Sequence, residues 1–347
     1  MKIKWGVIGA AGIADRRTIP GLLLAKNAEL WSVMDVDIGI TNRIKEKYNA
    51  RCAYNSVEAL LSDQEIDAVY IASPVFCHAE QVRLAADANK HILVEKPIAL
   101  NSAEAQDVVN YCMVKGVTIS AGFMMRFASY HQEMKRIIAS GKLGKIVNIN
   151  AQFSCWYPEA IGAWRQDKKL SGGGALMDMG VHLIDLIQYI TNEKIVKVFS
   201  FNDTKLFGYS VEDSSAILAQ LEGGAYVNIN SNFNIPDEAS KWRIEFYGSN
   251  GRIIGDETIG QVEGGTAEVL FENSNKEYDA NQNRTMCNKI LLDVELGNMY
   301  TKQIESFSEA IINRAQPEVS AADAVYVQKV VEAAYLSSET GRLIQIK

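Results

Sequence analysis

Cysteine, histidine and net positive charge are all scarce in this sequence. The five cysteines are scattered without any CxxC pair, and only four histidines occur among 347 residues. This usage argues against a disulfide framework and against a zinc site, and it favours reduced thiols in a cytoplasm. The net charge of −7 provides no basic surface for nucleic acid or for an anionic membrane.

Long apolar runs are also missing. No run is long enough to span a bilayer, and residues 1–4 lead straight into an apolar strand, which leaves no room for a signal peptide. We therefore expect a cytoplasmic protein with no membrane partner and no nucleic-acid partner. The rest of the composition, 48% hydrophobic and 22% charged, is typical of a globular chain, and its length predicts two domains.

Residues 1–122 alternate short apolar strands with helical patterns. Repeated β-α units of this spacing predict a doubly wound parallel sheet. The first strand runs into a turn containing Gly9, Ala11, Gly12 and Ile13, and a helix through about Leu24 follows. This context is typical of a dinucleotide-binding turn, with the pyrophosphate on the helix N-terminus, although an ordinary β-α connection is the alternative.

Asp35 ends the predicted second strand, at about the distance from the glycine turn where a ribose-binding carboxylate is expected. A carboxylate accepts hydrogen bonds from a ribose and repels a 2′-phosphate, and no arginine follows directly. NAD is therefore favoured over NADP as the cofactor. The alternative is that Asp35 caps a turn or a helix.

Polar residues follow two further strands of the predicted parallel sheet. Ser73 and Pro74 end one of them, with His78 opening the next helix, and Glu95 and Lys96 end another. Ligands bind outside the carboxyl ends of such strands, so these positions are candidate cofactor contacts. The alternatives are a solvated strand end with an incidental ion pair and a structural role for His78.

Residues 123–347 change in character, because strands with hairpin-like turns dominate from residue 146 onward. We expect an α+β domain with an open, mostly antiparallel sheet whose free face pairs subunits. A helix over 176–187 follows three glycines and carries Asp178, His182 and Asp185 at spacings of four and three, which predicts one shared face. A core histidine paired with a carboxylate is the alternative, and a metal site is disfavoured.

Together these stretches resemble the glucose–fructose oxidoreductase/inositol dehydrogenase/MocA (Gfo/Idh/MocA) family over essentially the whole chain. The resemblance rests on the glycine turn, the Glu95-Lys96-Pro97 motif, the segment 122–127, the glycines 172–174, the DxGxHxxD pattern from Asp178 to Asp185, and the C-terminal segment 332–342.

The resemblance implies a Rossmann domain over 1–122 that binds NAD or NADP. It implies a second domain over 123–347 that shapes the substrate site. We expect the open sheet face of this domain to form a homodimer or homotetramer. The usual reaction is oxidation or reduction at a carbon of a sugar, cyclitol or related polyol. Lys96 matches the active-site lysine, Asp178 the carboxylate and His182 the acid/base. Arg126, Trp164 and Arg165 are further candidates for substrate contact.

Two departures and two alternatives remain. Val75 and Met124 stand where the family often has asparagine. A related enzymatic reading is transient oxidation that permits elimination or hydrolysis of a glycoside. The competing class is a regulatory protein that senses sugar or cofactor without turnover, which joint retention of Lys96, Asp178 and His182 disfavours.

Overall fold

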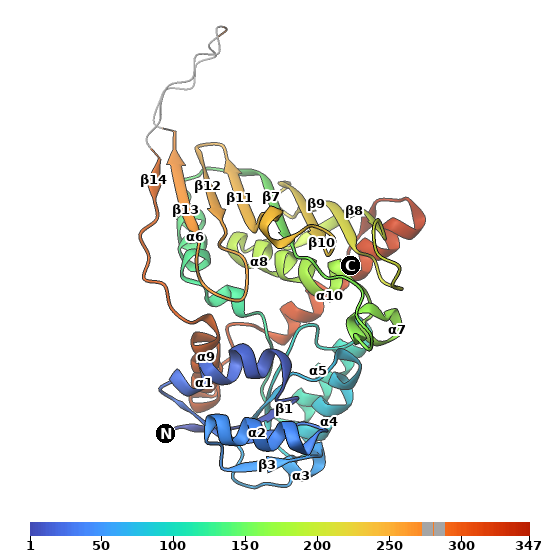
Figure 1. Cartoon of the computed structure of the whole chain (residues 1–347). Coiled ribbons are helices and arrows are strands. Elements are labelled where there is room, and N and C mark those ends of the chain that lie inside the picture. Colours follow the sequence, from blue (N-terminus) through green and yellow to red (C-terminus); the bar gives the residue numbers. More distant parts are fainter. Residues whose placement is uncertain (273–279, 281–288) are drawn as a thin grey trace.

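The computed structural model describes residues 1–272, 280 and 289–347, and its N-terminal unit is a parallel sheet between helices (Figure 1). The strand order in this sheet is β3-β2-β1-β4-β5-β6. The order reverses between β1 and β4, which places a ligand-binding crevice at their carboxyl ends. The strands are β1 (Ile3–Ile8), β2 (Ala28–Met34), β3 (Cys52–Tyr54), β4 (Ala68–Ile71), β5 (His91–Val94) and β6 (Ile119–Ala121).

The helices of this unit begin at side-chain caps where the sequence supplies them. Asp37 accepts hydrogen bonds from the amides of Gly39 and Ile40 at the start of α2, and Asn101 caps α5. The helix after the glycine turn starts with a wider π turn. The helices are η1 (Ala14–Thr18), α1 (Ile19–Leu24), α2 (Ile38–Tyr48), α3 (Val57–Leu61), η2 (Val75–Cys77), α4 (His78–Asp87) and α5 (Ser102–Lys115).

The second unit is built on a larger sheet with the order β14-β13-β12-β11-β7-β10-β9-β8-β15 among the described residues. Its neighbouring strands are antiparallel, except that β7 and β10 pair in parallel, so the predicted fold class is confirmed. The residue pattern does not predict β12, β13 or β14 individually. The strands are β7 (Ile146–Ser154), β8 (Ile195–Asp203), β9 (Ser214–Leu221), β10 (Tyr226–Asn232), β11 (Arg243–Gly248), β12 (Gly251–Asp256), β13 (Thr266–Phe271), β14 (Ile290–Leu291) and β15 (Ile344–Gln345).

Helices pack against one face of the larger sheet, where α8 contacts β7 and α10 contacts β8. At other positions of the same sheet, apolar side chains are exposed. They include Phe201 in β8, which is 69% exposed, and Leu218 in β9, which is 50% exposed. The helices of this unit are η3 (Met124–Phe127), α6 (Ser129–Ala139), η4 (Trp164–Gln166), α7 (Lys168–Ser171), η5 (Leu176–Gly180), α8 (Val181–Thr191), η6 (Asp237–Ala239), α9 (Met299–Asn313) and α10 (Ala321–Thr340).

Helix α9 returns from the second half of the chain to the first unit, where it lies beside α1 (Figure 1). Its residue Phe307 packs against Trp5, with ring centroids 5.7 Å apart, and the Trp5 indole donates a hydrogen bond to Ser308. The proposed boundary after residue 122 therefore does not separate two independent cores.

No helix among the described residues has the length and hydropathy needed to cross a membrane. Four cysteines, Cys52, Cys77, Cys112 and Cys155, are free thiols in the structure, and Cys287 lies outside the described residues.

Candidate active site

A cavity of about 710 Å³ lies where the carboxyl ends of the Rossmann strands meet the second unit. Lys96, Asp178 and His182 all line it. Lys96 follows the end of β5, and its ammonium donates hydrogen bonds to the Asp178 carboxylate (2.8 Å) and to the Asp178 carbonyl (2.6 Å). The structure therefore brings together three residues from two distant parts of the chain.

Asp178 lies in the π turn η5, immediately before α8. π turns are often found at functional sites, because the extra residue changes the direction of a side chain. The Asp178 amide bonds the Gly174 carbonyl at 2.9 Å. Gly180 is the last residue of this turn and is closely packed, since an added Cβ there would lie 2.8 Å from a Leu176 methyl group. The Asp178 side chain is about one third exposed (34%) and lines the cavity.

His182 lies at the start of α8 and is only 5% exposed. Two aromatic rings stand edge-on to it, Phe123 at 6.0 Å and Phe153 at 6.5 Å between centroids. Its Nδ1 is buried without a hydrogen-bond partner among the described residues. Burial, reinforced by the positive charge of Lys96, lowers the pKa of His182 well below its usual value, although Asp178 opposes the shift. The imidazole is therefore neutral at pH 7 and able to accept a proton.

The Asp178 carboxylate is ionised for a different reason. Burial alone would raise its pKa, but the charges of Lys96 and Arg165 outweigh that effect and hold the pKa well below its usual range. Arg165 approaches the carboxylate to 3.7 Å and its guanidinium stacks 4.3 Å from the Trp164 ring centroid. Trp164 and Arg165 both line the cavity, so the structure places these two predicted substrate contacts beside the predicted catalytic group.

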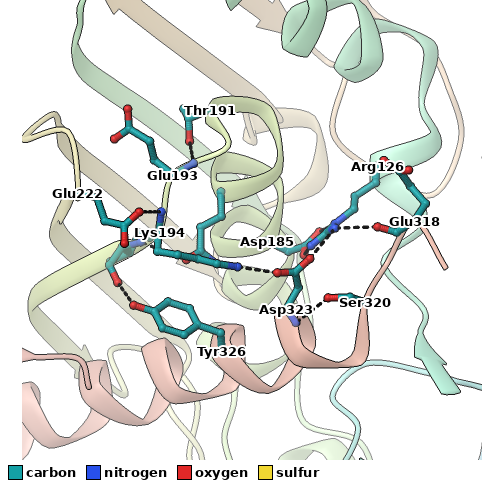
Figure 2. Close-up of polar contacts among 12 residues, drawn as sticks. Arg126, Asp185, Thr191, Glu193, Lys194, Glu222, Glu318, Ser320, Asp323 and Tyr326 are labelled. Carbon is teal, nitrogen blue, oxygen red and sulfur yellow. Dashed lines mark hydrogen bonds and ion pairs between the residues drawn. The ribbon is translucent and has the colours of Figure 1, made fainter. Parts of the chain in front are cut away.

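Arg126 lies elsewhere, and the expectation of a substrate contact is wrong for this residue. Its guanidinium forms a buried ion pair with Asp185 (2.5 Å) and also bonds Asp323 and the Glu318 carbonyl (Figure 2). Asp323 in turn pairs with Lys194. Arg126 is absent from the cavity lining because this network of carboxylates surrounds it.

The same network corrects the expected shared face of the 176–187 helix. Asp178 and His182 line the cavity, but Asp185 is 1% exposed and contacts Arg126 instead (Figure 2). Helix α8 is buried on all sides, so its successive polar residues meet different neighbours. The spacing in the sequence does not reveal which neighbour each one meets.

The predicted cofactor contacts follow the carboxyl edge of the parallel sheet. Ile13, Ser73, His78 and Glu95 line the cavity together with Lys96. The remaining ones lie outside the cavity lining, where the strands β1, β2 and β4 end: Gly9, Ala11, Gly12, Asp35 and Pro74. The candidates therefore form a strip that leads from the end of β2 into the cavity.

The glycine turn and Asp35 suit a dinucleotide. An added Cβ at Gly9 would lie 2.6 Å from the Ser73 amide nitrogen, so only glycine allows β1 and β4 to end this close together. Gly12, at φ +57°, has open space on its Cβ side. The Asp35 carboxylate accepts a bond from the Ala11 amide at 3.4 Å, whereas Asp37 caps the following helix.

Two polar groups in the cavity wall hold the strand ends in place. Both ring nitrogens of the buried His78 lie 2.8 Å from carbonyl oxygens, those of Pro97 and Ser73. The Glu95 carboxylate accepts a bond from the Tyr70 hydroxyl at 2.5 Å. Burial raises the pKa of Glu95, although Tyr70 and Lys96 oppose the shift. His78 thus ties together the ends of β4 and β5.

Sequence reasoning missed several cavity residues. Arg16 and Arg17 lie in η1, Trp242 immediately precedes β11, and Tyr300 lies in α9. The segment 259–264, which also lines the cavity, follows β12. They carry no local motif, because only the packing of the two units brings them together. Val75 and Met124, the two departures from the family pattern, are buried and also line the cavity.

The Rossmann unit, the strip of cofactor candidates and the Lys96–Asp178–His182 group define a dinucleotide-dependent oxidoreductase. Residues 3–123 match the oxidoreductase family with an NAD-binding Rossmann fold, and residues 131–254 match the GFO/IDH/MocA C-terminal domain. The chain belongs to the Gfo/Idh/MocA family and is an NAD(P)-dependent dehydrogenase or reductase.

The names of several relatives refer to sugars. A D-xylose 1-dehydrogenase (NADP+) of Haloferax volcanii is 27% identical over 342 residues, 99% of this chain and 99% of that protein. Glucose-6-phosphate 3-dehydrogenase of Bacillus subtilis is 31% identical over 251 residues, 68% of this chain and 69% of that protein. The solved complex of a levoglucosan dehydrogenase with NADH and levoglucosan has a TM-score of 0.87 at 19% identity and covers 100% of both chains.

Proposed function

We propose that this protein transfers a hydride between a nicotinamide and a hydroxyl or keto carbon of a sugar, cyclitol or related polyol. The observation that carries the proposal is the meeting of Lys96, Asp178 and His182 in one cavity at the carboxyl edge of the Rossmann sheet. The sugar-directed names of the relatives support the substrate class.

His182 takes the hydroxyl proton when the substrate is oxidised and returns it on reduction. Its lowered pKa keeps the imidazole in the neutral form that a general base needs, although the same shift weakens it as a base. Lys96 carries an ammonium beside the same group and polarises the reacting oxygen. Asp178, ionised and bonded to Lys96, orients the lysine and the substrate hydroxyl.

The cofactor we propose is NAD. Gly9 and Gly12 would let its pyrophosphate approach the N-terminus of η1, and Asp35 would accept hydrogen bonds from its ribose. When bound, the nicotinamide supplies the carbon that accepts or gives the hydride, while the protein supplies orientation and electrostatics. The negative charge of Asp35 disfavours the 2′-phosphate of NADP, the cofactor in the name of the Haloferax relative.

A panel of sugars and cyclitols tests this function. The purified protein is mixed with NAD and each compound, and NADH formation is followed by absorbance; the ketone products are tested with NADH in the reverse direction. We expect turnover with at least one polyol. Tight NAD binding without turnover of any member would instead support the non-catalytic sensor.

A further inference from the structure

The glycines before η5 are enclosed by two residues from distant parts of the chain, through the side chain of Tyr335 and the backbone of Glu212. An added Cβ at Gly173 would lie 1.9 Å from the Tyr335 hydroxyl oxygen, and one at Gly174 would lie 2.0 Å from the Glu212 carbonyl oxygen. Any larger residue would displace these groups. The glycines are therefore required by close packing against Glu212 and Tyr335.

The Glu212 carboxylate satisfies the backbone of this segment. It accepts hydrogen bonds from the Gly174 amide (2.9 and 3.0 Å), from the Leu176 amide (3.0 Å) and from the Tyr335 hydroxyl (2.8 Å). The Glu212 carbonyl accepts a further bond from the Ala175 amide. These bonds fix the free amides at the start of a helical turn, where a negative charge is also favourable.

We propose that Glu212 is a positioning residue for the active site. Its carboxylate, oriented by Tyr335, fixes the turn that carries Asp178 and thereby sets the contact between Asp178 and Lys96. The connection is continuous: Glu212 holds the Gly174 amide, the Gly174 carbonyl accepts from the Asp178 amide, and Asp178 accepts from Lys96. This inference rests on the proposed function only in its effect on turnover.

The neighbouring residue provides a matched control. Asp213 also accepts bonds from three backbone amides, those of Lys205 (2.8 Å), Leu206 (2.8 Å) and Phe207 (3.0 Å). These amides belong to a segment that does not line the cavity. The chain thus has two adjacent carboxylates that fix backbone in the same manner, and only one of them fixes the backbone before Asp178.

The test compares Glu212→Gln with Asp213→Asn. Both variants should lower the melting temperature, because each loses a charged acceptor for several amides. Glu212→Gln should also lower kcat by about ten- to a hundredfold, since small misplacements of reacting groups have effects of that size. Its Kd for NAD should stay within about twofold, and Asp213→Asn should keep wild-type kcat. Equal kcat losses in the two variants, or none in Glu212→Gln, would overturn the proposal.

Hydrogen exchange tests the same inference without turnover. In Glu212→Gln the amides of Gly174 and Leu176 should exchange faster than in the wild type, while Asp213→Asn should leave them unchanged. Unchanged exchange in Glu212→Gln would overturn the proposal even if every polyol proved inactive. If Glu212→Gln does not fold, Tyr335→Phe replaces it, with several-fold lower kcat and faster exchange expected; wild-type values in both would equally overturn it.

Discussion

Removing Lys96 and His182, singly and together, tests whether the two act on one substrate oxygen. Lys96 has two hydrogen bonds to Asp178 and an 11% exposed side chain, so Lys96→Ala leaves Asp178 with Arg165 at 3.7 Å as its remaining ion-pair partner. His182→Ala removes the neutral imidazole. General acid–base groups contribute about 10²–10⁴-fold, and each variant should lose kcat on that scale.

The kcat of the double variant tests more directly whether Lys96 and His182 act together. If each single change costs about 10³-fold, independent action predicts about 10⁶-fold for the pair. Groups that act as a unit are far from additive, so the double variant should lose much less than that product. Steady-state NADH absorbance measures kcat, and fluorescence titration measures NAD affinity, which His182→Ala should barely change because His182 lies in the second unit.

Buried residues outside the cavity serve as controls. His131 is fully buried and bonds the Met125 carbonyl, and Lys90 is buried and bonds two carbonyls. His131→Ala and Lys90→Ala should lower the melting temperature and leave kcat nearly intact. A His182→Ala variant that behaves like these controls, less stable but fully active when folded, would refute the assignment and leave His182 as a packed core residue.

Three further predictions concern cofactor, assembly and pH. Asp35→Ser combined with Val36→Arg should move preference from NAD toward NADP in fluorescence titrations, and tighter binding of NADP by the wild type would contradict the assignment. The open sheet face, with Phe201 and Leu218 exposed, should hold the protein as a dimer or tetramer; light scattering that shows a monomer at micromolar concentration would refute this, and Phe201→Asp should dissociate the oligomer. Burial lowers the pKa of His131 to about 4 in the folded chain, whereas in the unfolded chain the pKa is the usual one of about 6.5. Between pH 6.5 and pH 4 the unfolded chain therefore binds a proton at His131 and the folded chain does not. Stability should therefore fall from pH 6.5 to 4, by about 3 kcal/mol for this group, and unfolding curves of His131→Phe should show a correspondingly flatter dependence on pH.

The sequence reveals the parts of this site that local rules govern. A buried strand that stops at Glu95 and Lys96 places those residues at the carboxyl edge of a parallel sheet, and the structure puts both in the cavity. Helical spacing likewise brings Asp178 and His182 together.

Long-range packing decides the rest, and here the sequence is insufficient. Arg126 has the charge of a substrate contact, but α8 presents Asp185 to it and the pair is buried. The segment 259–264 lines the cavity only because the two units meet there, and no residue pattern in the segment predicts this position. Glu212 sits in an unremarkable connection before β9, and its function becomes visible only once the backbone amides around it are located.

The position of α9 also bears on how the protein is made. Trp5 leaves the ribosome well before Phe307 and Ser308, which cover it, because Ser308 lies 303 residues further along the chain. Until α9 has been synthesised, the dinucleotide-binding unit has an uncovered apolar face. A nascent chain that stalls before α9 therefore presents a surface that chaperones bind, and the first 122 residues alone are a poor choice for a portable cofactor-binding module.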